Sequence, residues 1–154
     1  MLAVNFNGSV RKWLIIGAVV LAVFLGAGLL MSRAAHNHQR AAAILIEDTL
    51  PLLGTGDPSK VLPLFVAGAL PDDTSVIEAR LKSWAVMGAL KEHGPIEQLG
   101  WSWQSSRGYK TEGTYRVRAQ YAAGSADIFW TIVTTSDGKL GVYDISVGEP
   151  SEQQ

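Results

Sequence analysis

The stretch that decides the fold runs from Trp13 to Met31 and reads WLIIGAVVLAVFLGAGLLM. It is 19 residues long and uncharged, and the indole of Trp13 is its only hydrogen-bonding side chain. As a helix it would cover roughly 28 Å, close to the hydrocarbon thickness of a bilayer, and a helix satisfies its own backbone hydrogen bonds in lipid. Basic residues flank it on both sides: Arg11, Lys12 and Arg33. The stretch therefore predicts a single transmembrane helix.

A cleaved signal peptide is the alternative for this stretch. Such a peptide has an apolar region of about 7–15 residues followed by a small-x-small cleavage site. The apolar run here is longer, and the residues after it, from Ser32 to His36, make a poor site. We therefore expect an uncleaved anchor. Arg11 and Lys12 precede the run without any acidic residue, which favours a cytoplasmic tail over residues 1–12 and an extracytoplasmic C-terminal domain.

The composition of the chain excludes several classes of function. Of the 154 residues, about 120 follow the predicted helix, which is enough for one hydrophobic core. The net charge is −1, so the broad basic field needed for nucleic-acid binding is missing and no nucleic-acid partner is expected. The chain has no cysteine, which excludes disulfides, a thiol nucleophile and a thiolate metal site.

The apolar stretch has small residues at four-residue spacing: Ala18, Ala22 and Gly26. This spacing places them on one helix face, where small side chains allow close approach of a second helix in lipid. The sequence makes this face a candidate for docking against another membrane helix. The alternative is that alanine and glycine are simply common in such helices.

Helical signals continue beyond the apolar stretch. Alanines and leucines favour helix from residue 32 to residue 53, with Pro51 marking an end or kink near Leu50. Asp57-Pro58 is a helix start signal that predicts a short helix to Ala67. A capping-box pattern, Ser75 with a glutamate three residues later, predicts a longer helix over residues 75–93.

After Gly94 the apolar period changes from helical to two. Alternation predicts four strands, over residues 96–104, 114–121, 126–135 and 140–147. Residues 122–125 are predicted to form a hairpin turn, and Asp137-Gly138 between the last two strands is a strong hairpin signal. The expected class is α+β: one N-terminal transmembrane helix over residues 13–31, then helices packed on a curved antiparallel sheet of about four strands. We assign this domain to residues 32–148 and a disordered tail to residues 149–154.

This order of elements resembles the nuclear-transport-factor-2-like (cystatin-like cone) superfamily. The resemblance covers residues 40–147, and its matching segments are Gly56-Asp57, Leu64-Phe65, Leu90 to Ile96, Tyr115 to Tyr121, Asp137 to Leu140 and Tyr143 to Ile145. It implies a cone-shaped domain. Membrane-anchored bacterial members of the superfamily, such as the type IV secretion inner-membrane assembly factor, imply assembly or scaffolding at the bacterial inner (plasma) membrane.

A second resemblance is to the cytochrome oxidase assembly factor family of anchored domains. The residues that carry it are Gly94-Pro95-Ile96, Gly113, Gly124 and Asp137-Gly138. It ranks second because residues 40–75 contain more predicted helix than that family usually has. This resemblance also implies an assembly role.

Residues with chemical potential are few. His36 and His38 point about 200° apart on a helix, so they cannot chelate one ion together, and at a membrane interface neither needs a special role. His93 is expected to cap the helix over residues 75–93. Resemblance to cone-fold isomerases would require an inward carboxylate among tyrosine or histidine donors, and the candidates are Asp127, Asp144, Tyr115, Tyr121, Tyr143 and His93. Nothing in their spacing shows convergence, so no catalytic, metal-binding or cofactor-binding residue is assigned.

Four tryptophans and two arginines form the candidate pocket or partner surface: Trp84, Trp101, Trp103, Trp130, Arg116 and Arg118. Aromatic side chains anchor both ligands and protein partners, and the arginines share one face of a predicted strand. The alternatives are an aromatic core for the tryptophans and a solvated sheet face for the arginines.

We therefore expect a non-enzymatic, single-pass, membrane-anchored accessory or assembly subunit. Its partners would be membrane lipid and either an integral membrane protein complex or further copies of the chain. Anchoring raises the effective concentration of a binding surface at the membrane, so that weak contacts suffice. The alternative function is a small-molecule-binding cone domain, with a lyase or isomerase activity in its interior.

Overall fold

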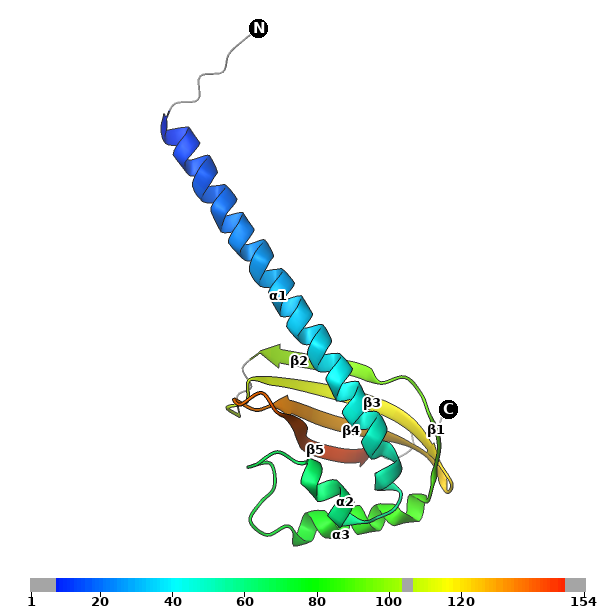
Figure 1. The fold of residues 1–154 in the computed structure, drawn as a ribbon. Helices are drawn as coiled ribbons and strands as arrows, with labels where there is room; N and C mark the ends of the chain where they lie inside the picture. The colour runs from blue at the N-terminus through cyan, green and yellow to red at the C-terminus, as the bar shows by residue number, and fades with distance from the viewer. Residues whose placement is uncertain (1–7, 104–106, 149–154) are drawn as a thin grey trace. The chain divides into compact units, whose positions relative to one another are not determined.

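The computed structural model describes residues 8–103 and 107–148 (Figure 1). By its internal contacts the chain divides into two compact units, residues 1–37 and residues 38–154. The long helix α1, Gly8–Leu53, contributes to both units. The disordered tail predicted for residues 149–154 lies outside the described residues.

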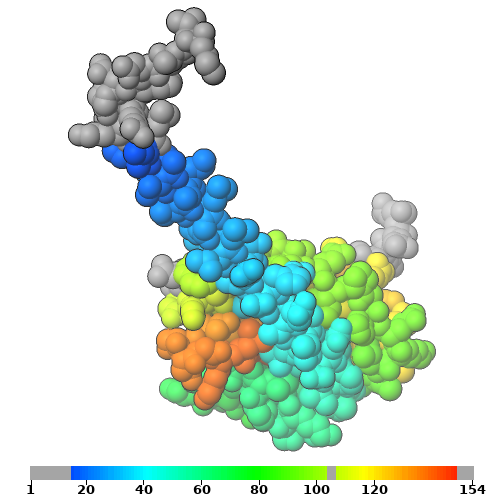
Figure 2. All heavy atoms as spheres, turned by 45° about the horizontal axis from the view of Figure 1, so that its top comes forward, coloured from blue at the N-terminus to red at the C-terminus, as the bar shows by residue number. Residues whose placement is uncertain are grey.

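The first unit contains the N-terminal part of α1. Among the described residues one helix, α1, is long and apolar enough to cross a membrane. Its residues from Ile15 to Met31 are exposed, apart from the partly covered Gly26 (Figure 2). Large apolar side chains on this stretch are between 47% and 72% exposed. None of the described residues therefore buries the apolar stretch in a protein core.

The second unit contains the end of α1, short helices and a sheet. The helical segments after α1 are α2 (Pro58–Val61), the 3₁₀ turn η1 (Leu62–Leu64), α3 (Ser75–Ser83) and the 3₁₀ turn η2 (Trp84–Met87). The strands are β1 (Leu90–His93), β2 (Glu97–Trp103), β3 (Thr111–Tyr121), β4 (Gly124–Thr134) and β5 (Leu140–Gly148). The predicted α+β class is confirmed, with five strands in place of about four.

All strand pairs are antiparallel, and the sheet is open (Figure 1). Its order is β1-β3-β4-β5, and β2 also pairs with β3. β1 and β2 share one edge of β3: Leu90 opposes Tyr121 at one end and Trp103 opposes Thr111 at the other. The two predicted hairpins, between β3 and β4 and between β4 and β5, are confirmed.

The predicted helix over residues 75–93 is wrong in its second half. The α-helix ends at Ser83, a 3₁₀ turn follows, and Gly88 adopts a left-handed φ of 72°. Leu90–His93 then forms β1 instead of a last helical turn. Trp84 lies in the core, and after it the glycine turns the chain so that Leu90–His93 joins the edge of the sheet.

The helix starts and ends follow local chemistry. Asp57 caps α2 by accepting a 3.1 Å hydrogen bond from the Ser59 amide, with Pro58 in the first helical position as predicted. α2 lasts one turn before η1, so the predicted helix to Ala67 is shorter than expected. α1 continues through Pro51 to Leu53. The proline removes one amide donor, on the exposed side of the helix.

The core lies between α1 and the inner face of the sheet. Residues 42, 46, 50 and 53 of α1 form a buried stripe, and alternate residues of β3 from Thr111 to Tyr121 face it. Two polar contacts join helix and strand. The Tyr121 hydroxyl donates a 2.8 Å hydrogen bond to the Leu50 carbonyl, and the Tyr115 hydroxyl and His38 Nδ1 share one of 2.9 Å.

These two contacts have matching spacings. His38 and Leu50 are twelve residues apart, which is about 18 Å along a helix. Tyr115 and Tyr121 are six residues apart, which is about 20 Å along a strand. The similar lengths mean that α1 and β3 follow each other in the same direction, with one polar contact near each end of the shared core.

The buried stripe on α1 predicts a sharp difference between two neighbouring isoleucines. Ile46 is fully buried and Ile44 is 56% exposed. We expect Ile46→Ala to lower the free energy of unfolding of the domain by about 2–5 kcal/mol, because it leaves a cavity in the core. Ile44→Ala should change it by no more than about 0.5 kcal/mol. Denaturant titration of the full chain in mild detergent, followed by tryptophan fluorescence, measures both. Equal losses would contradict the assignment of the buried face.

Candidate functional site

The two arginines predicted as a partner surface lie together on the outer face of the sheet. Both come from even-numbered positions of β3, whose odd-numbered neighbours face the core. Arg116 pairs with Glu97 on β2, with 2.6 Å between Nη2 and Oε2. Arg118 is exposed and stands opposite Asp127 on β4. Within residues 8–103 and 107–148, Arg118 forms no ion pair.

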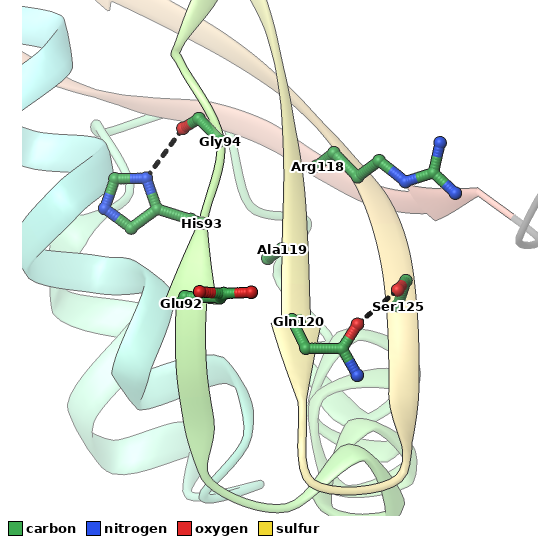
Figure 3. A pocket seen from close by; sticks show the side chains of 7 residues that line it. All are labelled: Glu92, His93, Gly94, Arg118, Ala119, Gln120 and Ser125. Atoms are coloured by element: carbon green, nitrogen blue, oxygen red, sulfur yellow. Dashed lines mark hydrogen bonds between the residues drawn. The ribbon is translucent and has the colours of Figure 1, made fainter.

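Three surface depressions meet at Arg118. The first, of about 320 Å³, extends along β1 and is lined by Glu92, His93, Gly94, Ala119, Gln120 and Ser125 (Figure 3). The second, of about 280 Å³, is lined by Pro95, Glu97, Arg116 and Asp127. The third, of about 460 Å³, is mostly apolar and includes Val86, Met87 and Val147. We call this region the Arg118 surface.

The side chains on the Arg118 surface do not converge on one point. Figure 3 shows the Arg118 guanidinium and the His93 imidazole projecting in opposite directions. His93 Nδ1 donates a 2.8 Å hydrogen bond to the Gly94 carbonyl, and the Ser125 hydroxyl donates to Gln120. His93 is therefore an exposed strand residue instead of the predicted helix cap. Among the described residues of this surface, no acid, base and nucleophile face each other.

The four tryptophans of the predicted surface lie on the opposite, inner side. Trp130 and Trp84 are buried at 1% and 9% exposure, in the core. Trp101 and Trp103 oppose Gly113 and Thr111, two inward-facing positions of β3. The structure thus does not bring the six residues together. The sheet separates an aromatic inner group from a basic outer group, and the binding role of either group stays a prediction.

The remaining predicted positions are open to solvent. Ala18 and Ala22 on α1 are exposed, and a side chain added at Gly26 would meet nothing within 4 Å. The face is therefore free in this chain, and docking of another helix there stays a prediction.

Asp144 is exposed, and Asp127 lies on the outer face beside Arg118. Neither carboxylate points into the core, where Tyr115 and Tyr121 are fully buried.

One polar group that sequence reasoning missed is His38. It was expected at a membrane interface, but it is 7% exposed and lies in the domain core, seven residues beyond the apolar stretch. Its ring stacks on Tyr115 with an interplanar angle of 8°. Its Nε2 is buried and has no hydrogen-bond partner among the described residues. The available signal was its position four residues before Ala42, in line with the buried stripe.

Burial sets the protonation of this pair. It lowers the pKa of His38 below its ordinary 6.5, because a charged imidazole would lose its hydration. For the same reason it raises the pKa of the Tyr115 hydroxyl to about 12. Both groups are therefore neutral at pH 7.

Within the described ranges, no cluster of three or more His, Cys, Asp or Glu residues has the geometry to hold a metal ion.

Comparison with family models, with curated proteins and with solved structures finds no match for this chain. Both family resemblances noted in the sequence therefore stay predictions. What the site can do must be argued from its own geometry.

The buried imidazole predicts a pH dependence of stability. The pKa of His38 is lower in the folded domain than in the unfolded chain, so the unfolded chain binds the proton more readily. The free energy of unfolding should be highest above pH 6.5 and should fall as the pH drops below it. His38→Asn gives Tyr115 an amide in place of the imidazole, and the amide does not titrate. The variant should therefore lose most of the change in unfolding free energy between about pH 8 and about pH 5.

Tyr115→Phe is the matched comparison, since it removes the hydrogen bond and leaves the buried imidazole. We expect it to lower the free energy of unfolding by about 1 kcal/mol at pH 8 and to retain a slope. Denaturant titrations at several pH values measure all three proteins. A His38→Asn protein with the full wild-type slope would contradict the prediction.

Proposed function

We propose that this chain is a single-pass, membrane-anchored accessory or assembly subunit. Its α+β domain docks on a larger membrane protein complex through the Arg118 surface. The observation that carries the docking proposal is Arg118 itself: an exposed guanidinium, unpaired within the described residues, at the meeting point of three depressions.

Anchoring is supported by the exposed apolar side chains of α1. Eleven large apolar side chains between Ile15 and Met31 are at least 47% exposed, with no polar side chain among the residues of that stretch. A contiguous apolar surface of this size is unfavourable in water and favourable in lipid. The basic residues before the stretch favour a cytoplasmic N-terminus, which places the domain on the extracytoplasmic side of a plasma membrane.

Docking is supported by the chemistry around Arg118. Arginine and aromatic residues dominate the energetics of protein interfaces, and Phe129 is 36% exposed on the same outer face, opposite Arg116. Arg116 already has a carboxylate partner in Glu97, whereas Arg118 is available to one. The partner surface that fits is acidic, with an apolar side chain to enter the depression beside Val86 and Met87.

The alternative function, a small-molecule site in the interior of the cone, has no specific observation in its favour. Fully buried aromatic side chains, Tyr115, Tyr121 and Trp130, fill the inner face of the sheet. The two carboxylates that would serve an isomerase lie elsewhere, since Asp127 is on the outer face and Asp144 is exposed.

The anchoring half of the proposal predicts retention in the membrane. The full chain should remain in the pellet after alkaline carbonate extraction of membranes. Leu21→Arg puts a charge near the centre of the apolar stretch, at a cost of about 2.5–3.5 kcal/mol for insertion, and should increase the extracted fraction. Ile44→Arg adds the same charge to an exposed position of α1 outside the stretch and should not. Complete extraction of the wild-type chain would refute anchoring.

The docking half predicts a partner that depends on Arg118. Purification of the full chain in mild detergent, with quantitative mass spectrometry, should recover a membrane protein complex with it. Arg118→Glu reverses the charge and should reduce recovery roughly tenfold or more, which corresponds to about 1.4 kcal/mol. Arg80→Glu makes the same change on α3, away from the Arg118 surface, and should leave recovery unchanged. A monodisperse monomer, or equal losses from both variants, would refute docking at this surface.

A further inference from the structure

One exposed tryptophan, a partly buried one and two exposed basic side chains lie at the end of the sheet where β2 ends and β3 begins. Trp103, the last residue of β2, is 43% exposed and packs edge-to-face on Trp101, with ring centroids 6.2 Å apart. In residues 107–110, Lys110 is exposed, and Arg107 is exposed but pairs with Glu112 and lies over the Tyr143 ring. We call Trp101, Trp103, Arg107 and Lys110 the proximal rim.

The proximal rim lies beside His38, the first residue of the second unit. Trp101 opposes Gly113 in the pairing of β2 with β3. A side chain added at Gly113 would come within 3.0 Å of the His38 ring. His38 and the proximal rim therefore share one end of the sheet.

The chain itself limits how far this end can be from a membrane. His38 follows Met31, the end of the apolar stretch, by seven residues within one helix, which is about 10 Å. The headgroup region of a bilayer extends about 5–8 Å beyond the hydrocarbon on each side. The chain thus tethers His38 and its neighbours in the sheet close to the headgroups, whereas the far end of the 11-residue β3 is not so constrained.

We propose that the proximal rim contacts the phospholipid headgroups of the membrane that holds α1. The inference rests on the membrane anchoring proposed above. Indole rings favour the membrane interface, where the apolar ring and the polar N–H are both accommodated. A lysine beside them, here the exposed Lys110, attracts the phosphates of anionic lipids. The contact makes the half-exposed Trp103 a membrane-facing residue and leaves the Arg118 surface, on the outer face of the sheet, for protein.

Quenching of tryptophan fluorescence by brominated phospholipids tests this contact in the full chain. The protein is reconstituted in vesicles of phosphatidylcholine and phosphatidylglycerol, brominated near the headgroup end of the acyl chains. Trp13→Phe removes the one tryptophan inside the apolar stretch and leaves the domain unaltered. We expect quenching in Trp13→Phe and loss of most of it in Trp13→Phe/Trp103→Phe.

A matched control uses the opposite end of the sheet. Val86 is 80% exposed, and the neighbouring Met87 carbonyl accepts a hydrogen bond from Ala123 in the β3–β4 turn. Val86→Trp in the Trp13→Phe/Trp103→Phe protein adds a tryptophan that is at least as exposed but far from the proximal rim. It should be quenched by aqueous acrylamide and not by the brominated lipid.

The single variant Trp103→Phe retains Trp13 and reports anchoring separately. Quenching of Trp103→Phe without quenching of Trp13→Phe would leave the anchor in place and overturn the headgroup contact. No quenching in either protein would overturn both proposals. A Trp103 shielded from lipid and from acrylamide alike would mean that protein covers the rim, and would also overturn the inference.

Discussion

The packing of the C-terminal part of α1 against the inner face of the sheet is the contact on which the rest of the structure depends. The buried stripe of α1 covers the alternate residues of β3 that face inward. Without it, the fully buried side chains of Tyr115 and Tyr121, which form hydrogen bonds with residues of α1, would lose their cover. The same helix carries the exposed apolar stretch at its other end, so the helix that completes the core also supplies the proposed anchor.

Two polar contacts give this packing its register. A helix with an apolar stripe can slide along an apolar sheet by one turn at modest cost, since apolar contacts are not directional. A slide of α1 would separate His38 from Tyr115 and Leu50 from Tyr121 at once, leaving buried polar groups unpaired. Each such group costs about 1–3 kcal/mol. The two hydrogen bonds therefore favour one position of the helix over its neighbours.

Much of the fold could be predicted because its signals are local. Alternation along Thr114–Tyr121 and the Asp137-Gly138 turn depend on neighbouring residues only, and both hairpins are where the sequence places them. β1 could not be predicted in this way. Leu90–His93 continues a helical pattern in the sequence, and it becomes a strand because Gly88 turns the chain and the edge of β3 offers unpaired backbone groups.

The candidate site was predictable only in part, because some of its features are local and others depend on contacts between distant segments. The two-residue period puts Arg116 and Arg118 on one face, which the structure confirms. Among the described residues, Arg116 has an ion-pair partner and Arg118 has none. This difference depends on Glu97 in β2, and the pairing of two strands is not visible in either strand alone. The burial of His38 likewise follows from the contact between α1 and β3, elements separated by more than 50 residues.

The position of Arg118 on β3 decides what its surface can do. β3 pairs with β1, β2 and β4, so its backbone is held along both edges, whereas a loop would have to be ordered on binding. A partner that contacts Arg118 meets a preformed surface and loses little conformational freedom in it. The inward residues of the same strand hold α1. One strand therefore fixes both the proposed protein-binding face and the helix that carries the proposed anchor, and the two proposals can be tested separately by mutation because they use alternate residues.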